Sequence, residues 1–384
     1  MRTSVMNARI IGYAAFCLII LAVPLFIDDG YLLNKLSRYL VFGILSMALS
    51  ISWGYTGILN LGQAVSFGLG SYCMAMALKL RTIPIQTGAN GLPDFMVWNN
   101  VKSMPWLWEP FHSYAFAICA GVAVPVVLAF LLGSFIFRAR VTGVYVAIIT
   151  LAMLVVINLL IIDQQRLTGG FNGITDLTTL ALFGVEFDAY SPATYYLVAL
   201  SLTAALFLGL ALISSKTGLI MQAIRDDETR VRYFGYDVAS YQNFAFCVSA
   251  GIAGFAGMLY TLVMEFASPT FLGVPISLSI VIWCAVGGRA SLVGSALGAI
   301  VVTGVQGSLS ETPAFLDTWL LIMGALFIAV VLFIPKGLVS VLDFRLFRRG
   351  RRRETPSARP APGAAAPETG RHASAALPKK FRAG

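Results

Sequence analysis

Charged side chains are scarce in this chain of 384 residues. Asp, Glu, Lys and Arg together make up only 12% of the sequence, whereas apolar residues make up 58%. A soluble domain carries about 25% charged and about 45–50% apolar residues. The composition excludes an ordinary soluble domain and predicts a protein that crosses a membrane several times.

Histidine and closely spaced cysteine are also lacking. The two histidines are His112, in a loop, and His372, near the C-terminus, and the five cysteines form no C-x-x-C pair. This pattern excludes a histidine–cysteine metal site and a disulfide framework. We expect no metal and no other cofactor.

A phosphate-binding loop is missing as well. The motif G-x-x-x-x-G-K-[ST] cradles the phosphates of ATP on its backbone N–H groups. Lys216-Thr217 is preceded by Ser214-Ser215 and not by the glycine that the motif requires. We therefore expect that this chain does not hydrolyse ATP and is not an enzyme.

Long apolar runs are what the sequence has in abundance. Because about 20 apolar residues cross a bilayer as a helix, we predict an all-α fold, a polytopic transmembrane helical bundle with about ten spans. The predicted spans are 10–27, 34–53, 62–80, 114–137, 141–162, 192–213, 241–262, 290–307 and 317–334. A shorter run at 271–286 is either a tenth span or a re-entrant half-helix. The five glycines of segment 54–70 predict a kinked or interrupted helix there.

The distribution of basic residues predicts the domain organisation and the orientation. From Arg345 onward there are 11 basic and 2 acidic residues, so this tail carries the whole net charge of +9. We predict a transmembrane permease domain at 1–343 and a basic, disordered cytoplasmic tail at 344–384. The tail would lie against anionic membrane lipid and would bind no nucleic acid.

With ten crossings, both termini of this multi-pass protein would face the cytoplasm from the bacterial inner membrane. The loops predicted inside are 138–140, 214–240 and 287–289, and those predicted outside are 81–113 and 163–191. Lys35 and Arg38, near the outer end of the second span, count against this orientation.

The densest group of charges is a segment between two predicted spans, residues 216–246, which we call the charged segment. Hydrocarbon cannot hold so many charges, so the segment must form a surface. Its apolar residues fall on one stripe of a helix and are Ile220, Ile224, Val231 and Phe234. We predict one helix of about four turns, ended by Gly235, that docks on a partner. The alternative is a solvated loop with internal ion pairs.

The charged segment resembles the cytoplasmic coupling loop of permeases of ABC-type importers, in the group that serves branched-chain amino acids and urea. The shared pattern is G-x-x-x-x-A-I-R-D-[DN]-E, followed by Gly, Tyr and Ala-Phe. The matching residues are Gly218, Ala223, Ile224, Arg225, Asp226, Asp227, Glu228, Gly235, Tyr241, Ala245 and Phe246. The resemblance extends over residues 53–72, 168–175, 266–299 and 332–338.

The resemblance implies the role of the segment and its partners. A helix carrying Gly218, Ala223, Arg225, Asp226, Asp227, Glu228 and Gly235 would couple the permease to ATP hydrolysis. The implied partners are two ABC ATPase subunits, a second homologous permease in a heterodimer and a periplasmic substrate-binding protein.

Two substrate classes are compatible with this resemblance. Residues 172–176, NGITD, and 281–295 are similar to the urea subunit and favour urea or a short amide, with branched-chain amino acids as the alternative. Candidate residues of the substrate path are Asn60, Gln63, Asn158, Asn172, Ser279, Trp283 and Gln306. For the polar residues the alternative role is hydrogen bonding between helices, and for Trp283 it is core packing.

Two other transport classes fit the sequence less well. A secondary transporter needs an ionisable residue inside the bilayer, and none is evident in the middle of a predicted span. A passive urea channel would need no structured docking helix. We therefore predict the permease subunit of an ATP-driven urea importer.

Overall fold

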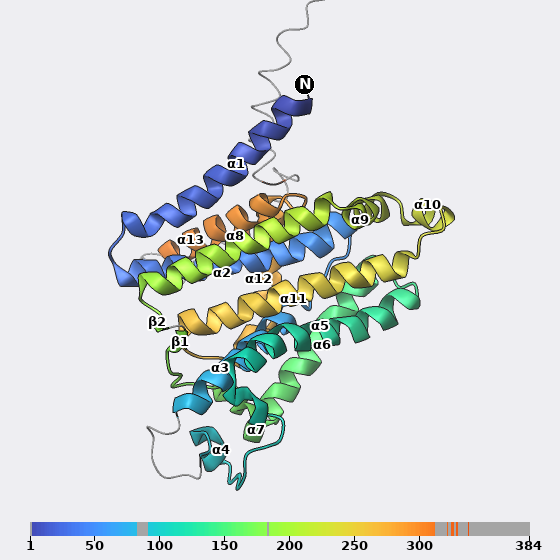
Figure 1. The fold of residues 1–384 in the computed structure, drawn as a ribbon. Coiled ribbons are helices and arrows are strands. Elements are labelled where there is room, and N and C mark those ends of the chain that lie inside the picture. Colours follow the sequence, from blue (N-terminus) through green and yellow to red (C-terminus); the bar gives the residue numbers. More distant parts are fainter. Residues whose placement is uncertain are drawn as a thin grey trace, which may run out of the picture. The chain divides into compact units, whose positions relative to one another are not determined.

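The computed structural model describes residues 2–82, 91–182 and 184–311, together with Leu321, Gly324, Ala325, Ile328 and Gly337. The longer helices are α1 (Arg2–Ala22), α2 (Gly30–Leu49), α3 (Gln63–Thr82), α5 (Tyr114–Arg138), α6 (Val144–Asp163), α8 (Pro192–Ser214), α11 (Val238–Met264), α12 (Val274–Gly287) and α13 (Leu292–Glu311) (Figure 1). These helices confirm the all-α fold class. The predicted tail, 344–384, lies outside the described residues.

Short elements connect these helices. They are η1 (Val23–Leu25), the π-helical turn η2 (Ser50–Gly54), α4 (Asp94–Trp98), η3 (Glu109–His112), α7 (Gln165–Thr168), η4 (Gly170–Asn172), α9 (Lys216–Asp226), α10 (Glu228–Tyr233) and η5 (Pro269–Leu272). A small antiparallel hairpin pairs β1 (Leu180–Leu182) with β2 (Val185–Phe187), with Leu180 opposite Phe187 and Leu182 opposite Val185.

Six helices in the described part of the chain are long and apolar enough to cross a membrane. They are Gly30–Gly54, Tyr114–Arg138, Val144–Asp163, Pro192–Ser214, Val238–Met264 and Leu292–Glu311. Helix α3 is not among them, and it packs instead against α11 and α5, where protein surrounds it. Most of the predicted span 317–334 lies outside the described residues.

Helix α12 is short for a membrane span. Its 14 residues extend over about 21 Å, whereas the hydrocarbon core is about 30 Å thick. Pro275 lies in its first turn, a position where proline removes no helical hydrogen bond. The length of α12 favours the half-helix over the full tenth span.

The glycine-rich segment after α2 is interrupted as predicted. Helix α2 continues into the π-helical turn η2, the chain is irregular near Gly57, and α3 begins at Gln63. Gly57 has a positive φ of 83°, which residues with a Cβ rarely adopt. The interruption leaves room for a side chain from the charged segment.

Helix α11 is the centre of the bundle. It packs against α2 on one side and against α3 and α5 on the other (Figure 1). Glycines permit these close approaches: a Cβ on Gly254 would lie 2.5 Å from Gly121 O, and one on Gly257 only 1.8 Å from Phe67 O. Close backbone packing of this kind holds helices together in lipid, where helices gain little from the hydrophobic effect.

The loops predicted on one side of the membrane lie together. At the end of the bundle that holds α9 and α10, Arg225 contacts Gly54 and Ser50 contacts Arg289. At the opposite end, the contacts between the two long loops and the helix ends are Lys79 with Asp94, Thr178 with Leu78 and Trp108 with Leu167. The grouping agrees with the predicted orientation, and which end faces the cytoplasm stays a prediction.

Candidate functional site

The charged segment folds into two short helices, α9 and α10. Between them Asp227 has an extended backbone, with φ −159° and ψ 97°, and its carboxylate accepts a hydrogen bond from Arg230 N at 3.1 Å. Asp227 is therefore the N-cap of α10. The prediction of one continuous helix is wrong, because an aspartate that caps the next helix takes a non-helical conformation.

The backbone at the start of α9 and after the end of α10 requires the two glycines of the motif, Gly218 and Gly235. Ser215 Oγ caps α9 by accepting a hydrogen bond from Gly218 N at 3.2 Å, and a Cβ on Gly218 would lie 2.3 Å from Leu212 O. At the other end Gly235 has φ 85°, as expected for the glycine after a helix. The predicted end of the helical region is confirmed.

Most of the predicted apolar stripe lies against the bundle. Ile224 and Val231 are buried with Val238 of α11, and Ile220 packs against them. Phe234 is 81% exposed, so its place in the buried stripe was predicted wrongly. It follows α10 as its C-cap, where the helical periodicity that defined the stripe no longer holds.

Ion pairs within the segment hold most of its charges. Arg230 lies 2.7 Å from Asp227, Arg232 pairs with Glu228 one turn away, and Arg225 lies 2.9 Å from Asp226. Exposed pairs of this kind contribute only about 0.3–0.5 kcal/mol each. The ion pairs that the sequence analysis expected for a solvated loop are thus present. They are weak and join residues within the segment, so they do not hold the segment on the bundle.

Arg225 fixes the segment to the bundle. Its Nη1 donates a hydrogen bond to Gly54 O at 2.9 Å, while Nε and Nη2 donate to Asp226 Oδ1. A Cβ on Gly57 would lie 3.4 Å from Arg225 Cγ, so the side chain passes close over the glycine backbone. A hydrogen bond from a charged donor is stronger than a neutral one, which makes this contact the main polar anchor of α9.

A pocket of about 210 Å³ opens beside this anchor. Its walls come from the irregular segment after η2, the ends of α5 and α6 with the loop between them, the start of α11 and the charged segment. The lining residues are Thr56, Gly57, Ile58, Phe137, Val141, Thr142, Gly143, Val146, Ile224, Arg225, Asp226, Asp227, Glu228 and Gln242. Four consecutive residues of the coupling motif, 225–228, therefore face a recess and not flat surface.

Asn60 and Gln63 are brought together in the centre of the bundle. Asn60 Nδ2 donates to Gln63 Oε1 at 2.7 Å, and Gln63 Nε2 donates to the backbone and hydroxyl oxygens of Ser249, both at 3.1 Å. Both side chains are buried. The network joins the broken segment to α11, a structural role that the sequence analysis gave as the alternative, and Ser249 is the partner that it missed.

The other candidate path residues do not join this network. Trp283 is buried, with its ring 4.7 Å from that of Phe42, and Ser279 Oγ donates to Pro275 O within α12. Asn172 is exposed in η4, and Gln306 is half-buried in α13. Asn158, half-buried in α6, has a buried Oδ1 with no hydrogen-bond partner among the described residues. The structure thus does not assemble the seven residues into one path.

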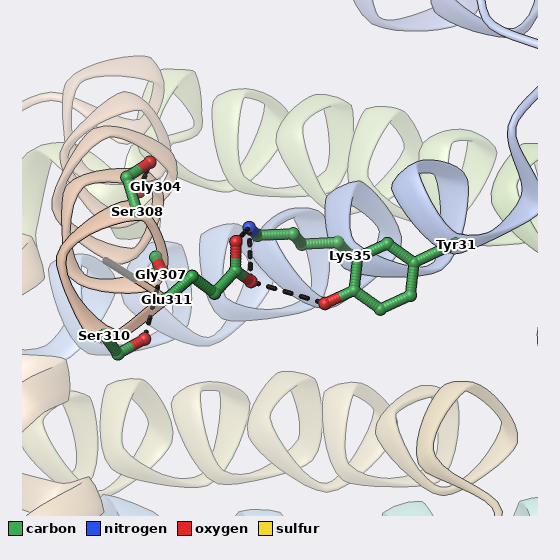
Figure 2. A network of polar contacts seen from close by, with 7 residues as sticks. All are labelled: Tyr31, Lys35, Gly304, Gly307, Ser308, Ser310 and Glu311. Atoms are coloured by element: carbon green, nitrogen blue, oxygen red, sulfur yellow. Dashed lines mark hydrogen bonds and ion pairs between the residues drawn. The ribbon is translucent and has the colours of Figure 1, made fainter. Parts of the chain in front are cut away.

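Lys35 and Arg38, near the start of α2, make or lack polar contacts that the sequence analysis did not predict, because it used these residues only for the orientation. Lys35 Nζ lies 2.7 Å from Glu311 of α13, and the Tyr31 hydroxyl donates to the same carboxylate (Figure 2). Arg38, one turn further along α2, has a buried Nε that no hydrogen-bond partner in the described part of the chain satisfies. An ionisable group within a membrane span points to function. The sequence feature that could have revealed Arg38 is therefore an arginine inside an apolar run.

Glu265, at the end of α11, makes the end of the bundle opposite the charged segment sensitive to pH. Burial, together with the nearby Asp188, raises the pKa of this carboxyl group above its usual value, and a hydrogen bond with the Ala189 backbone opposes the shift. The folded state therefore binds the proton more tightly than the unfolded state. We expect stability to fall as the pH rises from the usual carboxyl pKa of about 4.3 through the raised value.

Thermal unfolding of the purified protein across this pH window measures the effect. Glu265→Gln should flatten the fall, whereas Glu186→Gln, in the exposed strand β2, should keep it. A wild-type slope in Glu265→Gln would contradict the assignment.

Comparison with known proteins identifies relatives of the chain. Residues 31–331 match the family described as "Branched-chain amino acid transport system / permease component". The high-affinity branched-chain amino acid transport system permease protein LivM of Salmonella typhimurium is 26% identical over 354 residues, covering 85% of this chain and 74% of the relative.

Two further relatives carry similar names. LivM of Escherichia coli K12 is 27% identical over 353 residues, covering 84% of this chain and 74% of the relative. The probable branched-chain amino acid transport permease protein LivM of Methanocaldococcus jannaschii is 24% identical over 321 residues, covering 78% of this chain and 90% of the relative. No solved structure matches the chain.

Proposed function

This chain belongs to the permease-component family of branched-chain amino acid transport systems, and on that premise we propose that it is the membrane subunit of an ATP-driven amino acid importer. The observation that carries the proposal is the charged segment, a pair of surface helices anchored on the bundle through Arg225. Anchored helices can transmit a displacement imposed by a partner, whereas a mobile loop cannot. The energy would come from ATP hydrolysed in other subunits.

The partners follow from this role. Two ABC ATPase subunits would bind the charged segment, and a periplasmic binding protein would deliver substrate to the opposite end. A second homologous permease would complete the membrane part in the bacterial inner membrane. The exposure of three helices supports this arrangement. In the most apolar 18-residue stretches of α5, α6 and α8, only 28%, 22% and 28% of the residues are buried. Apolar surface is therefore left for lipid and for the second permease.

We propose a branched-chain amino acid as the substrate. The named relatives support this class, and they give no support to the prediction of urea. Arg38 supports it too, because a guanidinium with an unsatisfied buried N–H suits a substrate carboxylate, which urea lacks. Urea is the second candidate, favoured by the similarity of residues 172–176 to the urea subunit.

Uptake of labelled leucine and labelled urea tests this choice. The complete importer would be expressed in a strain that lacks its own uptake systems for both compounds. We expect ATP-dependent leucine uptake, which Arg38→Gln lowers by about tenfold or more if a charged hydrogen bond of about 1.5–3 kcal/mol is lost. Arg38→Lys, which keeps the charge, should lose less. Uptake of urea but not leucine would overturn the amino acid proposal.

The coupling role predicts that acidic residues of the charged segment are needed for transport. Asp227→Lys removes the N-cap of α10 and reverses a charge, and Glu228→Ala removes the partner of Arg232. Each should lower uptake and substrate-stimulated ATPase activity by about 5- to 150-fold, the range of ordinary coupling energies, while the protein still inserts. Asp163→Lys, at the opposite end of α6, is the control. Full activity in both variants would exclude the role.

A further inference from the structure

We propose that the π-helical turn η2 (Ser50–Gly54) mechanically connects the charged segment to the short helix α12, with Arg225 and Arg289 as positioning residues on its two sides. This inference rests on the proposed function as a powered importer. It adds the residues through which movement of the charged segment reaches the membrane interior.

The first contact joins the charged segment to η2. Arg225 Nη1 donates to Gly54 O at 2.9 Å across 171 positions of sequence. Nε and Nη2 of the same guanidinium donate to Asp226 Oδ1, and the stem of the side chain passes Gly57. Because Arg225 is held at both ends, a shift of α9 must either move Gly54 or break a charge-assisted hydrogen bond.

The second contact joins η2 to the turn between α12 and α13. Ser50 Oγ donates to Arg289 O at 2.8 Å, and the Tyr55 hydroxyl donates to Ala290 O at 2.8 Å. The Arg289 guanidinium lies 5.5 Å from the Trp53 ring centroid, within the range of a cation–π contact. A Cβ on Gly54 would lie 1.6 Å from Arg289 O. Gly54 thus touches the charged segment with its carbonyl and the α12–α13 turn with its Cα.

The third set of contacts ties that turn to α12. A Cβ on Gly298 of α13 would lie 2.4 Å from Trp283 O, and one on Gly287 would lie 2.0 Å from Gly294 O. The backbones of α12 and α13 therefore pack so closely that neither helix can shift alone. Trp283 packs on Phe42 of α2, and Ser277 Oγ donates to Leu61 O. Movement of the turn is thereby passed to the half-helix inside the bundle.

The conformation of η2 suits this role. π-Helical turns are rare and often occur at functional sites, because the extra residue can be accommodated in more than one register. An α-helical end of α2 would point the Gly54 carbonyl and the Ser50 hydroxyl in other directions, away from Arg225 Nη1 and Arg289 O. A contiguous chain of contacts becomes a coupling path only when both ends are shown to bias one element. The test therefore measures the coupling between the Arg225 contact and the Ser50 contact on the two sides of η2.

The test uses the complete importer in proteoliposomes, with labelled leucine, or labelled urea if wild type takes up that compound. Arg225→Gln, which loses the hydrogen bond to Gly54 O, and Ser50→Ala, which loses the hydrogen bond to Arg289 O, should each lower uptake per ATP hydrolysed by about tenfold. Because both residues act through η2, the double variant should be no worse than the single ones. Arg138→Gln, an exposed arginine at the same end of the bundle, is the control.

Three outcomes decide the inference. Reduced coupling in both single variants with no further loss in the double variant supports it. Normal uptake per ATP in Arg225→Gln overturns it, and so does a double variant whose losses multiply, since the residues would then act independently. Failure of the proposed function is distinguishable from these results, because the wild-type complex itself would then show no ATP-dependent uptake.

Discussion

Replacing Gly257 by alanine is expected to destabilise the folded protein strongly. A Cβ at this position would lie 1.8 Å from Phe67 O and 3.0 Å from Ser71 N. Both are backbone atoms, so no change of rotamer relieves the overlap, and α3 and α11 must move apart. One turn further along, the hydroxyls of Ser71 and Thr261 are 2.7 Å apart, and this contact would be lost with the packing.

The expected cost is at least about 3 kcal/mol, the upper part of the range for overpacking, from a total stability of about 5–15 kcal/mol. Size-exclusion profiles and thermal unfolding in detergent measure it. Gly304→Ala in α13 is the matched control, because its nearest neighbour would be Tyr39 Cε2 at 3.9 Å. That variant should be neutral or stabilised by up to about 1 kcal/mol from helix propensity. Equal behaviour of the two variants would show that the close approach of α3 and α11 is not required.

Lys79→Met should release the two long loops from the end of α3. The Lys79 side chain is only 2% exposed, lies 3.0 Å from Asp94 Oδ1 and donates to Thr175 O at 2.9 Å. The buried ammonium of Lys79 thus joins both α4, through Asp94, and the segment before β1, through Thr175, to the end of α3. Methionine fills a similar volume but leaves Asp94 and the carbonyl of Thr175 without this partner.

Removing one partner of a fully buried ion pair costs about 3–5 kcal/mol. Because Asp94 is 25% exposed and solvent screens part of its charge, we expect a loss below this range. We expect this loss to appear as faster proteolysis and hydrogen exchange in residues 91–113 and 173–182, at unchanged exchange in α11. Lys35→Met is the control, since its partner Glu311 is 51% exposed, and solvent screens such pairs. If the two methionine variants were equally protected, Lys79 would not hold the loops.

Several features could be predicted because their causes are local in sequence. Apolar runs of about 20 residues predicted the helices, since a backbone in lipid must satisfy its own hydrogen bonds. The glycines near residue 57 predicted the break after α2, and Gly235 predicted the end of the charged helices. Asp227 shows the limit of this reasoning. The apolar stripe on both sides of it, at Ile224 and Val231, suggested a continuous helix, whereas the capping ability of aspartate favoured a break.

Features made by distant residues could not be predicted. The partner of Gln63 is Ser249 and the partner of Arg225 is the carbonyl of Gly54, and no local pattern relates these positions. The sequence analysis grouped Asn60, Gln63 and Trp283 with four other residues as a path, since they are polar or bulky and most lie in or beside apolar segments. Packing instead satisfies the first two within a buried network and places Trp283 on Phe42.

The sequence by itself determined that this protein is a multi-pass helical membrane protein with a charged segment on one surface, because hydropathy and charge act residue by residue. It also determined the family through the order of its motifs. Only the tertiary structure decided how that segment is fixed. The position of Arg225 on Gly54, and of Gly54 against Arg289, depends on helices brought together by glycine contacts such as Gly257 on Phe67. Such contacts depend on the relative placement of whole helices, which no single stretch of sequence specifies.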